Sequence, residues 1–166
     1  MAQVVQNLNQ FNQTALVGQP DWTANQNIVS VKIYASSSGG AGLVAGIPIK
    51  YVDTAGDMPV VDICSGVTDT PIGVLIHRMK GDLFAAGQIV EAALGGSTIV
   101  LQTSAAIARG ARVQCDPTTS STYPTVATLT SLGTNASLGI NIDKPAATGA
   151  LTRIYIEPKD PNLSAY

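Results

Sequence analysis

Hydrophobic and polar residues alternate along most of the chain from residue 28 onward. In the run IVSVKIYA, at 28–35, every second residue from Val29 to Ala35 is apolar. This period of two is typical of a strand with one buried face. Similar runs bounded by Gly, Asp and Pro predict further strands at 47–52, 60–64, 72–77, 88–94, 98–102, 112–115, 138–142 and 152–157. Only the run SAAIAR, at 104–109, has a helical pattern, enough for a single turn.

These strands predict an all-β domain over residues 28–166, a compact β-sandwich or barrel of about nine short strands. The domain reads as two pseudo-repeated halves, at about 45–97 and 109–158, because glycines recur in both at nearly constant spacing. The matching pairs are Gly46 and Gly110, Gly73 and Gly139, and Gly87 and Gly149, which are 64, 66 and 62 residues apart. A repeat of this length is too long for a solenoid, so we expect two β subdomains packed around a pseudo-twofold axis.

Residues 1–27 lack the alternating pattern and are rich in Asn and Gln. Phe11 and Trp22 are the isolated large side chains of this segment. Low charge distinguishes it from an ordinary solvated tail, so we expect an extended N-terminal arm that orders on a neighbouring molecule. The alternative is a terminus without function. The residues expected to contact a partner are Phe11, Asn12, Gln13, Trp22, Asn25 and Asn27.

The composition favours association with other protein surfaces. Hydrophobic residues make up 45% of the 166 residues and charged residues only 12%, with a net charge of −2. Such a neutral exterior is poorly protected against self-association, so we expect a homo-oligomer or a protein docked on a larger surface. The chain has no Lys/Arg cluster, which argues against a nucleic-acid partner. It has neither a long apolar run nor a signal-peptide pattern, so we expect no membrane partner and folding in the cytoplasm.

The residues that carry chemistry are sparse and scattered. Cys64 and Cys115 stand 51 residues apart without a CxxC motif, so buried free thiols are favoured over a metal site or a redox pair. His77 is the only histidine, and its neighbours Arg78 and Lys80 oppose its protonation. The carboxylates of the first half do not form a calcium-loop pattern; they are Asp53, Asp57, Asp62 and Asp69. We therefore expect no catalytic residues, no metal and no cofactor.

Three segments carry a family resemblance. TPIGVLIHRMKGDLFAAGQIVEAAL at 70–94, SAAIARGARVQCD at 104–116 and SLGINIDKPAATGALTRIYIE at 137–157 resemble the decoration, or cement, proteins of tailed-bacteriophage capsids. The resemblance covers about residues 45–157, and the arm is similar to the variable N-terminal extension of that family. It implies a β-rich structural protein, commonly a trimer, on the outside of an icosahedral phage head. There it would staple neighbouring major capsid subunits and stabilise the shell of the virion.

A different class of function stays open on the residues alone. A β-sandwich recognition module for carbohydrates or host surfaces displays aromatic side chains on one sheet face. Tyr34 and Tyr51 are the residues that could supply such a face.

Overall fold

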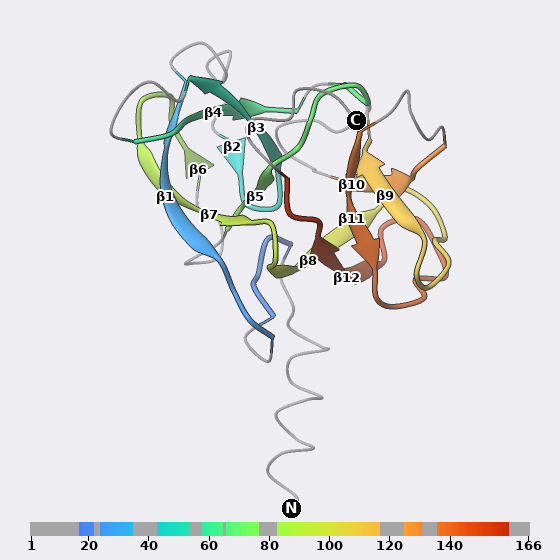
Figure 1. The fold of residues 1–166 in the computed structure, drawn as a ribbon. Coiled ribbons are helices and arrows are strands. Elements are labelled where there is room, and N and C mark those ends of the chain that lie inside the picture. Colours follow the sequence, from blue (N-terminus) through green and yellow to red (C-terminus); the bar gives the residue numbers. More distant parts are fainter. Residues whose placement is uncertain are drawn as a thin grey trace, which may run out of the picture.

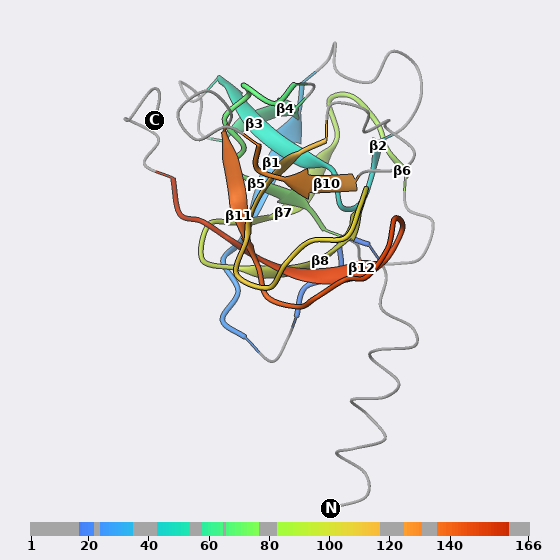
Figure 2. The ribbon, with the colours of Figure 1, turned by 90° about the vertical axis from the view of Figure 1, so that its right-hand side faces the viewer.

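In the computed structural model the two halves of the chain form two small closed barrels side by side (Figures 1 and 2). The structure describes residues 17–21, 24–34, 43–53, 58–64, 66–76, 83–116, 125–130 and 136–159. The first barrel has the strand order β1 (Ile28–Ile33), β4 (Val60–Ile63), β3 (Pro48–Asp53), β5 (Gly73–Leu75), β7 (Ile89–Leu94). The second has the order β10 (Thr125–Thr128), β8 (Thr98–Thr103), β12 (Leu151–Ile156), β11 (Ser137–Asn141), β9 (Arg112–Cys115). The short strands β2 (Leu43–Val44) and β6 (Leu83–Phe84) pair with each other.

The two barrels have the same topology, which confirms the two-part all-β fold. In each, the first strand pairs in parallel with the third, as β1 with β4 and β8 with β10. Each first strand also pairs antiparallel with the last, as β1 with β7 and β8 with β12. The strand registers of the two barrels also agree. In barrel one Lys32 lies opposite Val60 and Ile89. In barrel two Gln102 lies opposite the equivalent residues, Thr125 and Leu151. The repeat therefore includes β1 and β8 as well as the strands of the glycine-matched segments.

The glycines that match between the halves have matching backbone roles. Gly46 and Gly110 have φ of 91° and 77°, and both Gly87 and Gly149 have φ of 79°, a left-handed region that disfavours other residues. The third pair serves close packing, because a side chain on Gly139 would collide with the carbonyl oxygen of Tyr155. A side chain on its counterpart Gly73 would collide in the same way with the carbonyl oxygen of Ala93. Glycine at these two positions lets each strand cross its neighbour closely.

The barrels are joined by a shared apolar core. Barrel one encloses its own cluster, which includes Ile33, Leu75 and Val90. Its outer face contributes Val74, Ile76 and Ala93 to the cluster that fills barrel two. Alternate residues of β5 and β7 thus serve two cores at once, one on each side of the sheet.

Three equivalent inward positions distinguish the two barrel interiors. Barrel one has Ile33, Leu75 and Val90, and barrel two has Thr103, Asn141 and Thr152, all of them buried. The hydroxyl of Thr152 donates to Oδ1 of Asn141 at 2.6 Å. The amide of Asn141 donates to the carbonyl oxygens of Ile107, Ala108 and Asp143 at 3.4, 3.1 and 2.9 Å. Thr103 donates to the carbonyl oxygens of Ala147 and Ala150 at 3.1 and 3.3 Å.

The expected helical turn at 104–109 is wrong, and this polar network gives the reason. The carbonyls of Ile107 and Ala108 accept hydrogen bonds from Asn141, and that of Ser104 accepts one from Thr148 at 2.9 Å. The segment follows an irregular path that ends in the turn at Gly110. Six residues are too few to hold a helix against such competing partners.

Strand β10 was not expected from its sequence TVAT, although it lies 65 residues after β4, within the spacing of the repeat.

The close crossing of β11 and β12 gives a test of the glycine argument. Gly139→Ala is expected to lower the free energy of unfolding by about 3 kcal/mol, because the new methyl group displaces the backbone of β12. The matched control is Gly66→Ala, whose methyl group would meet only Oγ1 of Thr68 at 3.9 Å. That control should change the free energy by less than about 0.5 kcal/mol. Urea unfolding midpoints at constant m value measure both, and equal midpoints would contradict the close-crossing argument.

The buried amide of barrel two gives a second test. Asn141→Leu places the residue type of Leu75 at the equivalent position but leaves three loop carbonyls and the Thr152 hydroxyl without their partner. We expect a loss of about 3 kcal/mol from the free energy of unfolding. Thr152→Val removes one hydrogen bond only and should cost about 1 kcal/mol. Chemical denaturation checks both values, and a smaller loss for Asn141→Leu than for Thr152→Val would refute the network.

Candidate interaction surface

The segment 17–21, expected as part of the arm, lies along the edge of β8 in barrel two. The N–H of Gly18 donates to the carbonyl oxygen of Val100 at 2.7 Å, and the N–H of Val100 donates to that of Gln19 at 2.9 Å. The N–H of Asp21 donates to the carbonyl oxygen of Thr98 at 2.8 Å. Because β8 already pairs with β12 on its other edge, this segment completes the hydrogen bonding of β8 at residues 98–100.

Gly18 is fixed between the two barrels. Its φ is 80°, and a side chain there would collide with the backbone N of Gly46 in barrel one. Its own N–H is bonded to barrel two, and the side chain of Val17 packs on the core of barrel two. The chain that precedes residue 17 therefore starts from a defined point at the junction of the barrels.

The last residues before β1 bind the turn that joins the barrels. The side chain of Gln26 donates to the carbonyl oxygens of Asp21 at 2.6 Å and Thr98 at 3.3 Å. The N–H of Asn27 donates to Oγ of Ser97 at 2.8 Å, and that hydroxyl donates back to the carbonyl oxygen of Asn27 at 3.3 Å. Asn27 and Ser97 are equivalent positions of the two halves. The carbonyl oxygen of Asn27 accepts a hydrogen bond from the N–H of Leu94, and that of Ser97 accepts one from the N–H of Ile156. Equivalent residues of the two halves therefore contact each other at the joining turn.

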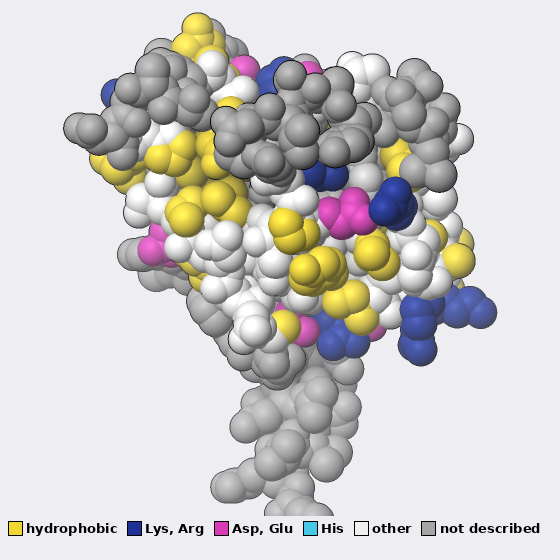
Figure 3. Space-filling view, viewed as in Figure 1, with side chains coloured by type: hydrophobic (Ala, Val, Ile, Leu, Met, Phe, Trp, Pro, Cys, Tyr) yellow, Lys and Arg dark blue, Asp and Glu magenta, His cyan; other side chains and the backbone are white. Residues whose placement is uncertain are grey.

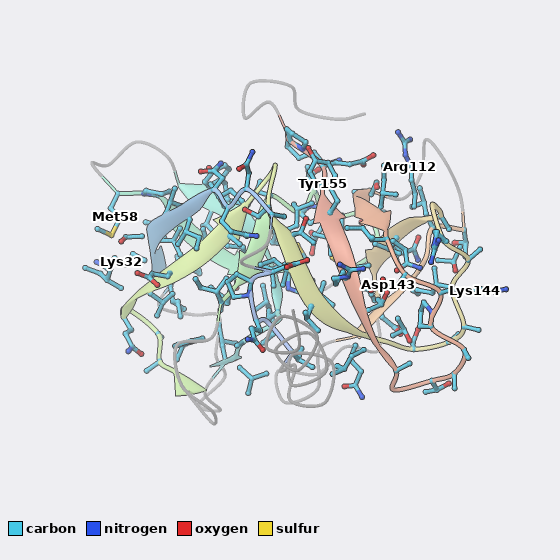
Figure 4. All side chains as sticks on the ribbon, turned by 90° about the horizontal axis from the view of Figure 1, so that it is seen from below. Lys32, Met58, Arg112, Asp143, Lys144 and Tyr155 are labelled. Atoms are coloured by element: carbon cyan, nitrogen blue, oxygen red, sulfur yellow. The ribbon has the colours of Figure 1, made fainter. Side chains whose placement is uncertain are left out.

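An ion-pair cluster holds the segment to β12. Arg153 lies 2.7 Å from Oδ1 of Asp143 and 3.4 Å from Oδ2 of Asp21. The Arg153 guanidinium holds the pKa of Asp143 below its usual value, chiefly through their side-chain hydrogen bond. Figure 4 shows Asp143 and Lys144 on the barrel-two side of the molecule, across from Lys32 and Met58 on barrel one.

The structure describes only two of the six residues expected to contact a partner. Phe11, Asn12, Gln13 and Trp22 lie outside the described residues. Asn25 is exposed and lies between segment 17–21 and β1 in the chain. The side chain of Asn27 donates to the carbonyl oxygen of Gly95 at 3.2 Å, within its own chain. The sequence signal for this contact is the Gly18-Gln19-Pro20 break, all three residues of which pair with β8.

Barrel one presents a group of apolar side chains on its outer face, named here the apolar band; barrel two exposes Leu151 and Tyr155 at 40% and 37%. The band consists of Tyr34, Val52, Val60 and Ile89, which lie around the exposed Lys32, the register partner of both Val60 and Ile89. Tyr34, Val52 and Ile89 are 39%, 43% and 58% exposed. The equivalent positions of barrel two carry Ser104, Asp116, Thr125 and Leu151. Figure 3 shows hydrophobic side chains on the side of the molecule where β1 lies and also across the middle of the same face.

The edge of β1 near this band differs from the equivalent edge of β8. In barrel two the corresponding edge of β8 is covered by residues 18–21. No described residue pairs with the equivalent edge of β1 at Ile28 and Ser30. An unpaired edge next to exposed apolar side chains is a place where another polypeptide can add a strand.

The two tyrosines of the recognition hypothesis do not share a face. Tyr34 points outward from barrel one, whereas Tyr51 packs against the core of that barrel. A flat aromatic platform for a sugar ring needs both rings on one surface. The structure therefore gives the carbohydrate-binding alternative no specific support.

The candidate chemical residues are dispersed in the structure. Asp69 is paired with Lys50 at 2.8 Å, and Asp62 accepts the N–H of Ile63 at 2.7 Å. Among the described residues, no three side chains of His, Cys, Asp or Glu are grouped as metal ligands. His77 and Asp57 lie outside the described residues, as does the side chain of Asp53. In the part of the chain that is described, no helix has the length and apolar character needed to cross a membrane.

Comparisons with known proteins find similarity in the fold but none in the sequence. No protein-family model and no curated protein matches the sequence. The structure is similar to the crystal structure of the N base of the head fiber gp8.5 in bacteriophage phi29, with a TM-score of 0.50 and 12% sequence identity. The match covers 80% of this chain and 95% of the phage chain. The likeness shows a shared fold across both barrels.

The ion-pair cluster predicts how stability depends on acid. Because the pKa of Asp143 is lowered in the folded protein, its stabilisation is complete above the unfolded value of about 3.9 and is lost as pH falls through the folded value. Arg153→Met should reduce the loss of unfolding free energy between pH 7 and pH 3 by up to about 1 kcal/mol, a small effect because the pair is half exposed. Lys144→Met, a neighbouring exposed cation, is the control. Identical acid dependence in both variants would contradict this role of Arg153.

Proposed function

We propose that the protein is a non-enzymatic structural component of a bacteriophage head that binds the outside of the capsid as a decoration, or cement, protein. The observation that carries this proposal is the fold likeness to the N base of a phage head fiber, which spans both barrels rather than one. The sequence resemblance to capsid decoration proteins over residues 45–157 points to the same class independently of the structure.

The surface of the protein supports a role in docking. The net charge of −2 and the charged fraction of 12% leave little long-range repulsion between the protein and a large neighbour. The apolar band and the open edge of β1 offer area and backbone groups to a partner. Residues 1–16 precede the fixed point at Gly18, so a contact made by Phe11, Asn12 or Gln13 would be anchored to both barrels.

The proposed partner is the major capsid protein, and the proposed effect is mass action. A protein that binds only the assembled shell stabilises it by its binding free energy, repeated over many copies. We propose that neighbouring capsid subunits are stapled in this way. A homotrimer at a symmetry point of the shell would engage several subunits at once.

The decisive experiment removes the part of the arm that precedes the segment bound to barrel two. Because residues 17–21 and 24–27 are bonded to β8 and the joining turn, the deletion should remove residues 1–16 and leave Val17 onward intact. We expect the shortened chain to keep its unfolding midpoint but to lose at least tenfold in affinity for purified shells that lack the protein. Sedimentation of shells with bound protein measures occupancy, and Phe11→Ala in the full chain should reproduce part of the loss.

A surface variant provides the matched control for that experiment. Ile89→Ser, at the start of β7, changes the apolar band and leaves the arm intact, so a loss of occupancy in this variant alone would place the contact on the apolar band instead. Full occupancy by both variants would contradict the proposed use of the arm. Failure of the intact protein to bind shells at all would overturn the proposed function.

A further inference from the structure

We propose that Cys64 and Cys115 form a disulfide bond that crosslinks the two barrels when the protein is exposed to a small-molecule disulfide such as oxidised glutathione. Both thiols are free in the structure, which confirms that they are buried and unpaired. The inference goes beyond the proposed function and does not depend on it.

The two cysteines come from different barrels and meet at their junction. Cys64 directly follows β4 of barrel one, and its N–H donates to the carbonyl oxygen of Pro48 at 2.9 Å. Cys115 is the last residue of β9 in barrel two. The Cys64 side chain has Cys115 as a neighbour at the junction, and Cys115 raises the pKa of the Cys64 thiol. The two side chains are 5% and 2% exposed, so both thiols are closed to solvent.

The backbone on both sides of this contact is held by the fold. The N–H of Ala136 donates to the carbonyl oxygen of Val67 at 2.8 Å, which ties the loop after Cys64 to the start of β11. The next residue, Ser137, lies opposite Gln114 of β9, the residue before Cys115. Cys64 and Cys115 are therefore attached to backbone segments that already contact each other across the junction.

The cysteine pair is specific to the junction and was not produced by the duplication. The equivalent of Cys64 in barrel two is Leu129. The N–H of Cys64 donates to the carbonyl oxygen of Pro48, the first residue of β3, and the N–H of Leu129 donates to that of Arg112, the first residue of β9. The equivalent of Cys115 in barrel one is Tyr51, which lies 64 residues earlier. A thiol was thus placed independently in each half, at the two positions that meet. A disulfide needs this proximity and two fixed attachment points.

The chemistry of the pair explains why it stays reduced until an oxidant is supplied. The contact with Cys115 raises the pKa of the Cys64 thiol well above its ordinary value, and burial raises it further. Few thiolates are present at neutral pH, so exchange is slow and requires local opening of the junction. One thiolate attacks the oxidant and forms a mixed disulfide, and the second displaces the leaving thiolate. The protein loses two electrons and two protons, and one oxidised glutathione becomes two reduced glutathione molecules.

The crosslink would act on the joint that the fold depends on. It would close a loop between residues that are 51 positions apart, which includes β5, β7 and β8. A loop of this length restricts the unfolded chain strongly, so oxidation stabilises the folded protein. The bond is suppressed where thiols are kept reduced and favoured in oxidising surroundings.

The test compares the intact protein with single-cysteine variants. The full chain is incubated with excess oxidised glutathione a few degrees below its Tm, denatured, alkylated and weighed by mass spectrometry. We expect the wild type to lose two hydrogen atoms, to take up no alkyl group and to gain more than about 5 °C in Tm. Dithiothreitol should reverse all three changes. Cys64→Ala and Cys115→Ala should instead take up one glutathione each, with no gain in Tm.

The outcomes that overturn the proposal are equally direct. Two alkylated cysteines, or two glutathione adducts on the wild type, would mean that the thiols cannot reach bonding geometry. A disulfide that forms but lowers Tm would mean that it strains the junction rather than securing it. Far-ultraviolet circular dichroism of each alanine variant verifies that it is folded before it is used.

Discussion

The packing of barrel one's outer face into barrel two is the contact on which the other features depend. Val74, Ile76 and Ala93 point away from their own barrel and complete the core of the second. A five-stranded barrel has a small interior, and each half alone would expose one of these faces. The junction therefore makes one folding unit of two duplicated halves. It also fixes the position of segment 17–21, in which Gly18 lies against Gly46 of barrel one and is hydrogen-bonded to Val100 of barrel two.

The two halves have kept the same frame and changed their surfaces and interiors. The frame is preserved by glycines at turns and crossings and by the strand registers. The interiors differ because Asn141 and Thr152 bind the loops of barrel two, where Leu75 and Val90 pack apolar side chains in barrel one. The exteriors differ at the apolar band. Duplication supplied a stable scaffold, and divergence left barrel one with the apolar band and, among the described residues, an edge of β1 that no segment covers.

Most strands could be predicted from the sequence because β alternation is a local property. The run from Val29 to Ile33 alternates strictly, and its odd residues are the buried ones. The repeat was detectable because positive φ and close strand crossings demand glycine at fixed places. Strand β10 was missed because TVAT is short and its pairing with β8 and β9 is what makes it a strand. The helical pattern at 104–109 failed because Asn141, more than thirty residues away, binds its carbonyls.

The sequence by itself determined the all-β class, the duplication and the scarcity of charged and catalytic side chains. Each of these follows from residue type and spacing, which need no knowledge of distant contacts. Only the tertiary structure decided that each half closes as its own barrel, that residues 17–21 and 24–27 are bonded to barrel two and the joining turn, and that Cys64 lies beside Cys115. Those facts depend on which distant segments lie side by side, and a chain of alternating short strands is compatible with many such arrangements until its cores are packed.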